Sequence, residues 1–180
     1  MTALVAVVAA AVAAATVGAG SYIDTTPAPV NTAYLSAAVG YFDAFRDSNI
    51  PARNDSAADL RVEYNPLWVI YKRGIVTVTP VFGVEATTDG SAYGLGGLQA
   101  DLQYHQWYLT PSFAAGLYWS GEGKNMGSPV EFRSQIETGY EFGNQSRLGV
   151  AVSHISNASL SNTNPGSEIL SVYYHHPVNF

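Results

Sequence analysis

Three residues in the last thirty positions of the chain have the side-chain types that acyl transfer needs. They are His154, Ser156 and Glu168, an imidazole, a hydroxyl and a carboxylate close together in the sequence. A serine hydroxyl becomes a good nucleophile only when a base takes its proton, and that base needs an acceptor on its other ring nitrogen. The set could therefore form an acyl-transfer triad; the alternative is that the ends of these segments simply become polar at a membrane interface.

The spacing of these residues places them on one surface. Because His154 and Ser156 are two positions apart, their side chains project from the same face of a strand. Glu168 begins the next segment on the parity of that segment's apolar face. Two segments joined by a single loop are expected to lie side by side and antiparallel. The three polar groups should thus converge at one end of an otherwise apolar surface. In the first segment the apolar face with the parity of His154 and Ser156 consists of Leu148, Val150 and Val152. In the second segment the apolar face with the parity of Glu168 consists of Leu170, Val172, Tyr174 and Val178.

The elements that must position these groups are strands. The sequence alternates with period two and is punctuated by Gly, Asn, Asp and Pro. Eight segments are expected, at 34–46, 60–72, 74–86, 92–104, 107–119, 131–142, 147–157 and 167–178. Short connections alternate with longer ones, and an even strand number with this alternation is typical of bacterial outer-membrane barrels. The predicted fold is all-β, an eight-stranded antiparallel transmembrane β-barrel of the bacterial outer membrane.

The composition supports a barrel with lipid outside. Of 180 residues only 12% are charged, with a net charge of −6, whereas soluble domains carry about 25%. The chain has no cysteine, which excludes disulfides and a thiol nucleophile, and no basic patch that would bind nucleic acid. The competing interpretation is a soluble barrel of lipocalin type, which would show the same period-two alternation. Aromatic residues near the segment ends favour the membrane reading: Tyr34, Tyr64, Trp68, Trp107, Trp119, Tyr173 and Tyr174.

Charged residues within the predicted strands are expected to face a polar, non-conducting interior. An unpaired buried charge is costly, so these residues should form ion pairs. They are Arg61, Glu63, Glu85, Arg133 and Glu137. By contrast, His105, His175 and His176 have no comparable set of partners, and we interpret them as turn or rim residues.

The N-terminal stretch 2–19 contains only apolar and small residues. It predicts a signal peptide at 1–19, followed by an N-terminal segment at 20–33 and the barrel at 34–180. No Lys or Arg precedes the apolar run, so a transmembrane anchor or a buried helix remain alternatives.

From residue 131 onward the sequence resembles the PagL-type lipid A 3-O-deacylases of Gram-negative outer membranes. The most specific part is His154-x-Ser156-Asn157-Ala158-x-Leu160, followed by Asn164-x-Gly166-x-Glu168. Supporting matches are Phe132-Arg133, Gly139-Tyr140-Glu141-Phe142 and Gly149. The first hundred residues match only in the rhythm of their strands.

The resemblance implies a function and a site. By position it makes Ser156 the nucleophile, His154 the base and Glu168 the residue that orients the base, and Asn164 the oxyanion-binding residue. The remaining candidates for oxyanion or substrate binding are Asn157, Ala158 and Ser159. Two residues depart from the family, Pro165 after Asn164 and Ser159 where a glycine is expected. The implied enzyme is an outer-membrane serine esterase that removes the 3-O-linked acyl chain of lipid A, with its site facing the outer leaflet and without cofactor or metal.

The expected partners are then lipid A, or lipopolysaccharide, and outer-membrane lipid. Nucleic acid is not an expected partner, and a homodimer is possible. Arg46, Arg53 and Lys124 are loop residues that could meet lipid phosphates. One alternative is a non-catalytic small barrel with a structural, adhesion or resistance role. Another is a phospholipase acting on glycerophospholipid.

Overall fold

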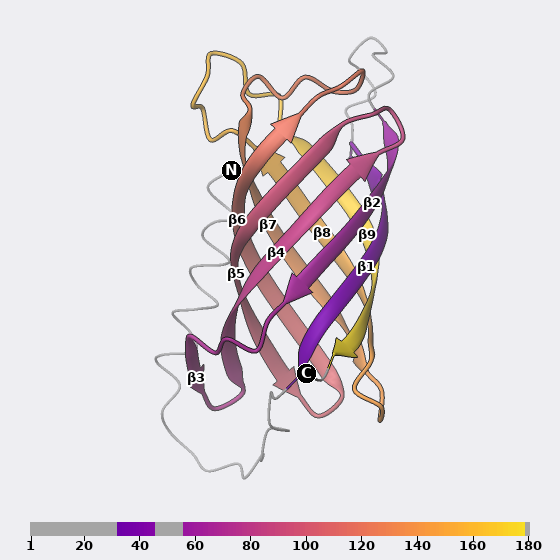
Figure 1. The fold of residues 1–180 in the computed structure, drawn as a ribbon, viewed down its shortest axis with the longest axis vertical. Coiled ribbons are helices and arrows are strands. Elements are labelled where there is room, and N and C mark those ends of the chain that lie inside the picture. Colours follow the sequence, from indigo (N-terminus) through magenta and orange to yellow (C-terminus); the bar gives the residue numbers. More distant parts are fainter. Residues whose placement is uncertain (1–31, 46–55, 179–180) are drawn as a thin grey trace.

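The computed structural model describes residues 32–45 and 56–178, and its strands form one closed antiparallel barrel (Figure 1). The strands are β1 (Ala33–Phe42), β2 (Ala57–Asn65), β3 (Tyr71–Arg73), β4 (Val76–Thr87), β5 (Ala92–Tyr104), β6 (Trp107–Trp119), β7 (Val130–Glu141), β8 (Arg147–Ser156) and β9 (Ser167–Val178). Pairings β1–β9 and β2–β4 close the circuit of eight long strands, which confirms the predicted fold class. No helix among the described residues is long and apolar enough to cross a membrane.

The second predicted segment, 60–72, was wrong in its bounds. Strand β2 ends at Asn65, directly before Pro66, and residues 71–73 form the separate short strand β3. Proline has no backbone N–H and is poorly tolerated in a paired strand. Strand β3 pairs only with the first residues of β4 and lies outside the closed circuit. The predicted signal peptide, the 20–31 stretch, Arg46 and Arg53 lie outside the described residues.

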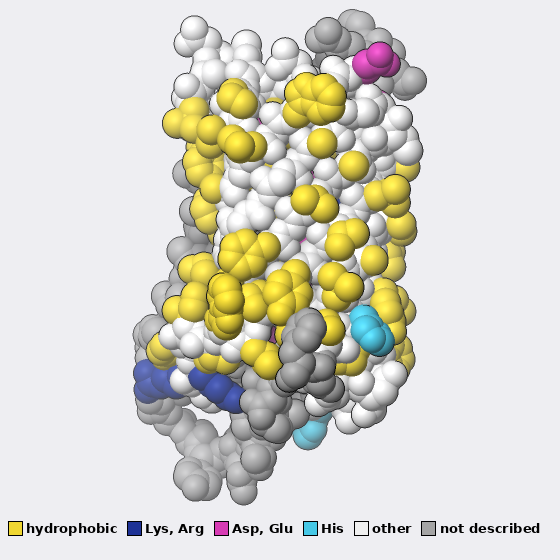
Figure 2. All heavy atoms as spheres, in the orientation of Figure 1, with side chains coloured by type: hydrophobic (Ala, Val, Ile, Leu, Met, Phe, Trp, Pro, Cys, Tyr) yellow, Lys and Arg dark blue, Asp and Glu magenta, His cyan; other side chains and the backbone are white. Residues whose placement is uncertain are grey.

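The two faces of the wall follow the predicted alternation. Along β2, Leu60, Val62 and Tyr64 face outward and are exposed, while the alternating charged residues Asp59, Arg61 and Glu63 are buried. Figure 2 shows the outward face as scattered apolar side chains over most of the barrel height. Such an apolar exterior around a polar interior is the pattern of a barrel that spans lipid.

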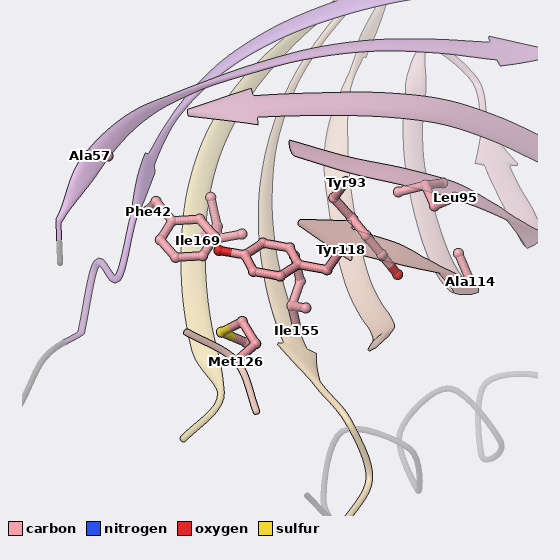
Figure 3. Close-up of a cluster of buried hydrophobic side chains, with 9 residues drawn as sticks. All are labelled: Phe42, Ala57, Tyr93, Leu95, Ala114, Tyr118, Met126, Ile155 and Ile169. Carbon is pink, nitrogen blue, oxygen red and sulfur yellow. The ribbon is translucent and has the colours of Figure 1, made fainter. Parts of the chain in front are cut away.

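The interior contains three levels, from the end of the barrel with the long loops to the end with the short turns. We call these the loop end, with residues 43–45 and the connections 88–91, 120–129 and 157–166, and the turn end, with the connections 105–106 and 142–146. Near the loop end lies an apolar cluster (Figure 3) of Phe42, Ala57, Tyr93, Leu95, Ala114, Tyr118, Met126, Ile155 and Ile169. It fills the barrel directly behind the end of β8 and the start of β9.

The middle level is an ion cluster. Arg61 Nε lies 2.6 Å from Asp59 Oδ2 and 3.1 Å from Glu85 Oε2. Arg133 Nη1 lies 2.6 Å from Glu63 Oε1. These pairs confirm that the charged strand residues face inward as ion pairs. Removing one member of a buried pair typically costs about 3–5 kcal/mol because the other charge is left uncompensated.

The ion cluster and the level nearest the turn end together correct three sequence predictions. Tyr34 and Tyr173 were expected near the lipid interface, but both are buried inside the barrel. Tyr34 lies under Arg147, whose guanidinium is 4.8 Å from the ring centroid. His175 was interpreted as a turn or rim residue, yet its ring bridges Ser36 and Glu137 inside the barrel. All three side chains have the inward parity of their strands. They were assigned to the interface or rim because aromatic and imidazole rings are common there.

Candidate active site

Strands β8 and β9 bring His154 and Glu168 face to face near the loop end. The two residues are direct partners in the antiparallel register, and His154 Nδ1 lies 3.1 Å from Glu168 Oε1. Their side chains are 25% and 43% exposed on the outward side of the wall. An ionised carboxylate can only accept a hydrogen bond, so a neutral imidazole that donates to it carries its hydrogen on Nδ1 and its lone pair on Nε2. In that tautomer the contact with Glu168 orients the ring and leaves Nε2 able to accept a proton.

Ser156 is the last residue of β8 and has the same outward parity as His154. Its side chain is buried, and its register partner on β7 is Phe132. The intervening Ile155 and the residue after Glu168, Ile169, point into the apolar cluster on the other side of the wall (Figure 3). These two inward anchors fix the orientation of the outward side chains.

Gly166 lies against the imidazole of His154. Its φ of +64° is in the left-handed region that favours glycine. A Cβ added there would lie 3.0 Å from His154 Cε1. A side chain at this position would displace the ring, so the approach of the loop to His154 depends on the glycine.

Asn157 ties the loop that follows β8 to a second loop. This side chain is fully buried, and its Nδ2 donates to Met126 O at 2.9 Å and to Thr163 O at 2.8 Å. Its Oδ1 accepts the N–H of Ser159 at 3.0 Å. The sequence left the role of Asn157 open, because Met126 belongs to the distant 120–129 connection and the contact appears only in three dimensions.

Asn164 is held by the same residue in a defined orientation. The backbone N–H of Asn157 donates to Asn164 Oδ1 at 3.0 Å. A backbone N–H cannot accept a hydrogen bond, so the atom that faces it must be the amide oxygen. The Nδ2 group of Asn164 consequently points away from this contact and is directed by it.

Ala158 and Ser159 both have positive φ angles, 54° and 66°. Ser159, where the resembling family has a glycine, thus adopts a backbone conformation typical of glycine. Its N–H is engaged with Asn157, as described above, and both side chains are exposed at the tip of the turn. Lys124, considered as a phosphate-binding residue, instead pairs with Asp43 at 2.5 Å.

An apolar hollow lies on the outer face of β4, β5 and β6, separated from Ser156 on β8 by strand β7. It has a volume of about 440 Å³ and is lined by Val78, Gly96, Gly97, Leu98, Gln99, Ala100, Pro111, Phe113, Ala114 and Ala115. In the strand register, Ser156 on β8 pairs with Phe132 on β7, Phe132 pairs with Ala115 on β6, and Ala115 pairs with Gly96 on β5. The last two residues line the hollow. Phe132 stacks on Phe113 with ring centroids 6.0 Å apart. Sequence reasoning missed this hollow, because small residues on neighbouring strands create it jointly.

Within residues 32–45 and 56–178, no group of three or more His, Asp or Glu side chains is arranged to hold a metal ion. The chemistry available at the site is that of the side chains themselves: an oriented imidazole, a serine hydroxyl on the same strand and face, and an oriented carboxamide. This combination suits acyl transfer to a hydroxyl.

Comparison with known proteins gives a consistent result. A family model described as "Lipid A 3-O-deacylase (PagL)" matches residues 58–177. The lipid A deacylase PagL of Pseudomonas aeruginosa is 38% identical over 55 residues, which cover 31% of this chain and only 32% of that relative. The crystal structure of the outer membrane enzyme PagL has a TM-score of 0.63 at 20% identity, covering 81% of this chain and 99% of that one. Neisserial surface protein A (NspA) has a TM-score of 0.50 at 12% identity, covering 81% and 97%. At these identities the two solved structures establish the fold alone.

Proposed function

Because this chain belongs to the lipid A 3-O-deacylase (PagL) family, we propose that it is an outer-membrane esterase that removes the 3-O-linked acyl chain of lipid A. The observation that carries the proposal is the His154–Glu168 pair, 3.1 Å apart on the outward face of the wall. A polar, hydrogen-bonded pair on a surface that otherwise meets lipid has no role in the packing of the barrel. It has the arrangement of a base in an ester hydrolase.

In the proposed reaction, Ser156 Oγ attacks the carbonyl carbon of the ester while His154 Nε2 accepts its proton. Glu168 stabilises the imidazolium that forms. The ester C–O bond then breaks, and His154 returns the proton to the departing sugar oxygen. Water attacks the acyl-serine by the same route, releasing a fatty acid and restoring Ser156.

The oxyanion of the tetrahedral intermediate needs donors, and Asn164 Nδ2 is the side-chain candidate. Asn157 supports this role because its N–H orients the Asn164 carboxamide through Oδ1. Removing one oxyanion donor typically raises the barrier by about 3 kcal/mol. The Ser159 N–H donates to Asn157, so we propose that Ser159 acts by shaping the turn and that Ala158 offers the neighbouring backbone N–H.

The substrate is proposed to approach from the lipid side. With the loop end at the outer leaflet, the ester carbonyls of lipid A would lie at the level of His154. The acyl chain that is cleaved would occupy the hollow lined by Gly96, Phe113 and Ala115. This geometry keeps the chain in an apolar environment before and after cleavage.

Mass spectrometry of lipid A from a bacterial host that expresses the protein tests the function. We expect wild type to remove one 3-hydroxyacyl chain, and Ser156→Ala, His154→Ala and Glu168→Ala each to leave lipid A intact. Ser153→Ala is the matched control, because Ser153 lies on the same strand with its side chain inside the barrel. Intact lipid A with folded wild-type protein would contradict the proposal and favour a non-catalytic barrel, whereas fatty acid release from glycerophospholipid alone would indicate a phospholipase.

A further inference from the structure

Residues 66–75, which we call the β3 segment, leave the barrel wall at the turn end. They connect β2 to β4 and contain the short strand β3 (Figure 1). The Ile70 N–H donates to Val78 O at 2.9 Å, and the Gln103 N–H donates to Ile75 O at 3.1 Å. Hydrogen bonds to both β4 and β5 give this segment a defined position at the turn end of the barrel, where Leu67 and Val69 line a pocket with the interior residue Arg147.

The β3 segment exposes a run of large apolar side chains. Trp68 is 66% exposed and Ile70 is 59% exposed. Exposed neighbours in the same segment are Leu67, Val69, Tyr71 and Ile75. Trp68 contacts Phe82 of the outward wall, with ring centroids 6.4 Å apart. The apolar surface of the segment is therefore continuous with the lipid-facing belt.

The same segment holds Lys72 and Arg73, both exposed. Every other Lys or Arg that the structure describes is enclosed by the barrel or paired with a carboxylate: Arg61, Lys124, Arg133 and Arg147. Among the described residues, Lys72 and Arg73 pair with no carboxylate. Figure 2 shows the Lys and Arg side chains of this face gathered at its lower left, where Figure 1 places β3.

Tryptophan and tyrosine beside basic residues, at the border of an apolar belt, mark the level of the lipid headgroups. Basic residues at that level attract anionic phospholipids rather than zwitterionic ones. We infer that the β3 segment binds the phosphate groups of anionic glycerophospholipids, in the leaflet opposite the one that meets His154. Because the apolar surface of the segment continues into the lipid-facing belt, a ligand bound there would lie in the bilayer. This position favours a lipid over a soluble partner.

Quenching of Trp68 fluorescence by brominated lipids tests this inference. Trp107 and Trp119 are replaced by Phe so that Trp68 is the sole tryptophan, and the full-length protein is folded into phosphatidylcholine vesicles. The quencher is brominated phosphatidylglycerol in one series and brominated phosphatidylcholine in the other. We expect about five-fold stronger association of the anionic lipid at low salt. The preference should weaken as salt rises from about 0.05 M to about 0.5 M because the charges are screened.

The double variant Lys72→Gln/Arg73→Gln should lose the preference, and the charge-retaining pair Lys72→Arg/Arg73→Lys should keep it. A gel-mobility shift on heating verifies that each variant is folded; if the Gln variant does not fold, the salt dependence of the sole-Trp protein decides. Equal quenching by the two lipids, or a preference that survives removal of both charges, would overturn the inference. So would the absence of quenching by either lipid, since it would place the segment in water.

Discussion

The barrel contains two groups of a serine, a histidine and a glutamate, one inside and one on the outer wall. Inside, His175 Nδ1 lies 2.7 Å from Ser36 Oγ, and His175 Nε2 lies 2.6 Å from Glu137 Oε1. Outside, His154 Nδ1 lies 3.1 Å from Glu168 Oε1, with Ser156 two residues further along the same strand. Residue types alone do not distinguish these groups.

The surroundings of the two groups distinguish them. Ser36, His175 and Glu137 are 1%, 9% and 4% exposed, and both ring nitrogens of His175 are engaged. Tyr108 donates a further hydrogen bond to Glu137 at 2.6 Å, and the Tyr173 ring stacks on His175. The inner group therefore has the character of a structural network, which a lipid ester cannot reach. The outer group opens to the side from which such a substrate would come, and an apolar hollow lies on the same wall beyond β7.

The largest contrast is expected between the two histidines. His154→Ala should lower kcat by about 10⁴-fold, because the proposed base is lost, while the free energy of unfolding changes little. His175→Ala should instead lower the free energy of unfolding by about 3 kcal/mol, since it breaks the link between Ser36 and Glu137. Deacylation kinetics and urea titration of the vesicle-embedded protein measure the two effects, and reversed results would exchange the roles of the groups.

A second prediction tests the outer group through Asn164. Asn164→Asp keeps the oxygen that accepts the Asn157 N–H but removes the Nδ2 donor, so kcat should fall by about 10²–10³-fold with KM nearly unchanged. Asn162→Asp adds the same charge to the same loop at an exposed position and serves as the control. Equal losses in both variants would indicate a general charge effect rather than loss of an oxyanion donor.

The third prediction concerns the hollow. Ala115→Leu narrows it beside Phe132 and should reduce kcat/KM about ten-fold for long acyl chains, with a smaller loss for short ones. Gly94→Leu is the matched control, since a Cβ at Gly94 meets open space and Gly94 is not part of the hollow. The measurement is a series of lipid A substrates that differ in acyl length. The same loss at every length would mean that the hollow does not hold the chain that is cleaved.

The smallest effect is expected from the inner serine. Ser36→Ala removes one hydrogen bond to His175 and should cost about 1 kcal/mol of unfolding free energy. Deacylation rates should stay within about two-fold of wild type, because the inner group does not contact the substrate in this account. A large loss of activity with unchanged stability would show that the two groups are coupled.

Much of this contrast could be predicted from the sequence. Period-two alternation placed Arg61, Glu63 and Arg133 inside and His154 outside, because parity is a local property of a strand. The end of β2 directly before Pro66 was missed. The period-two alternation of apolar residues gives no signal there, whereas proline lacks the backbone N–H that strand pairing needs. The position of His175 was missed because large aromatic and imidazole side chains occupy both parities from Tyr173 to His176. The roles of Asn157 and of the hollow depend on contacts between distant segments, which no local pattern contains.

Labelling with a fluorophosphonate tests the central claim most directly, because the reagent bonds only to a serine that a nearby base activates. The folded protein is treated in vesicles, digested, and mapped by mass spectrometry. We predict label on Ser156 and none on Ser36, with labelling abolished by His154→Ala and retained in His175→Ala. Label on Ser36, or an unlabelled Ser156 in protein that deacylates lipid A, would contradict the account.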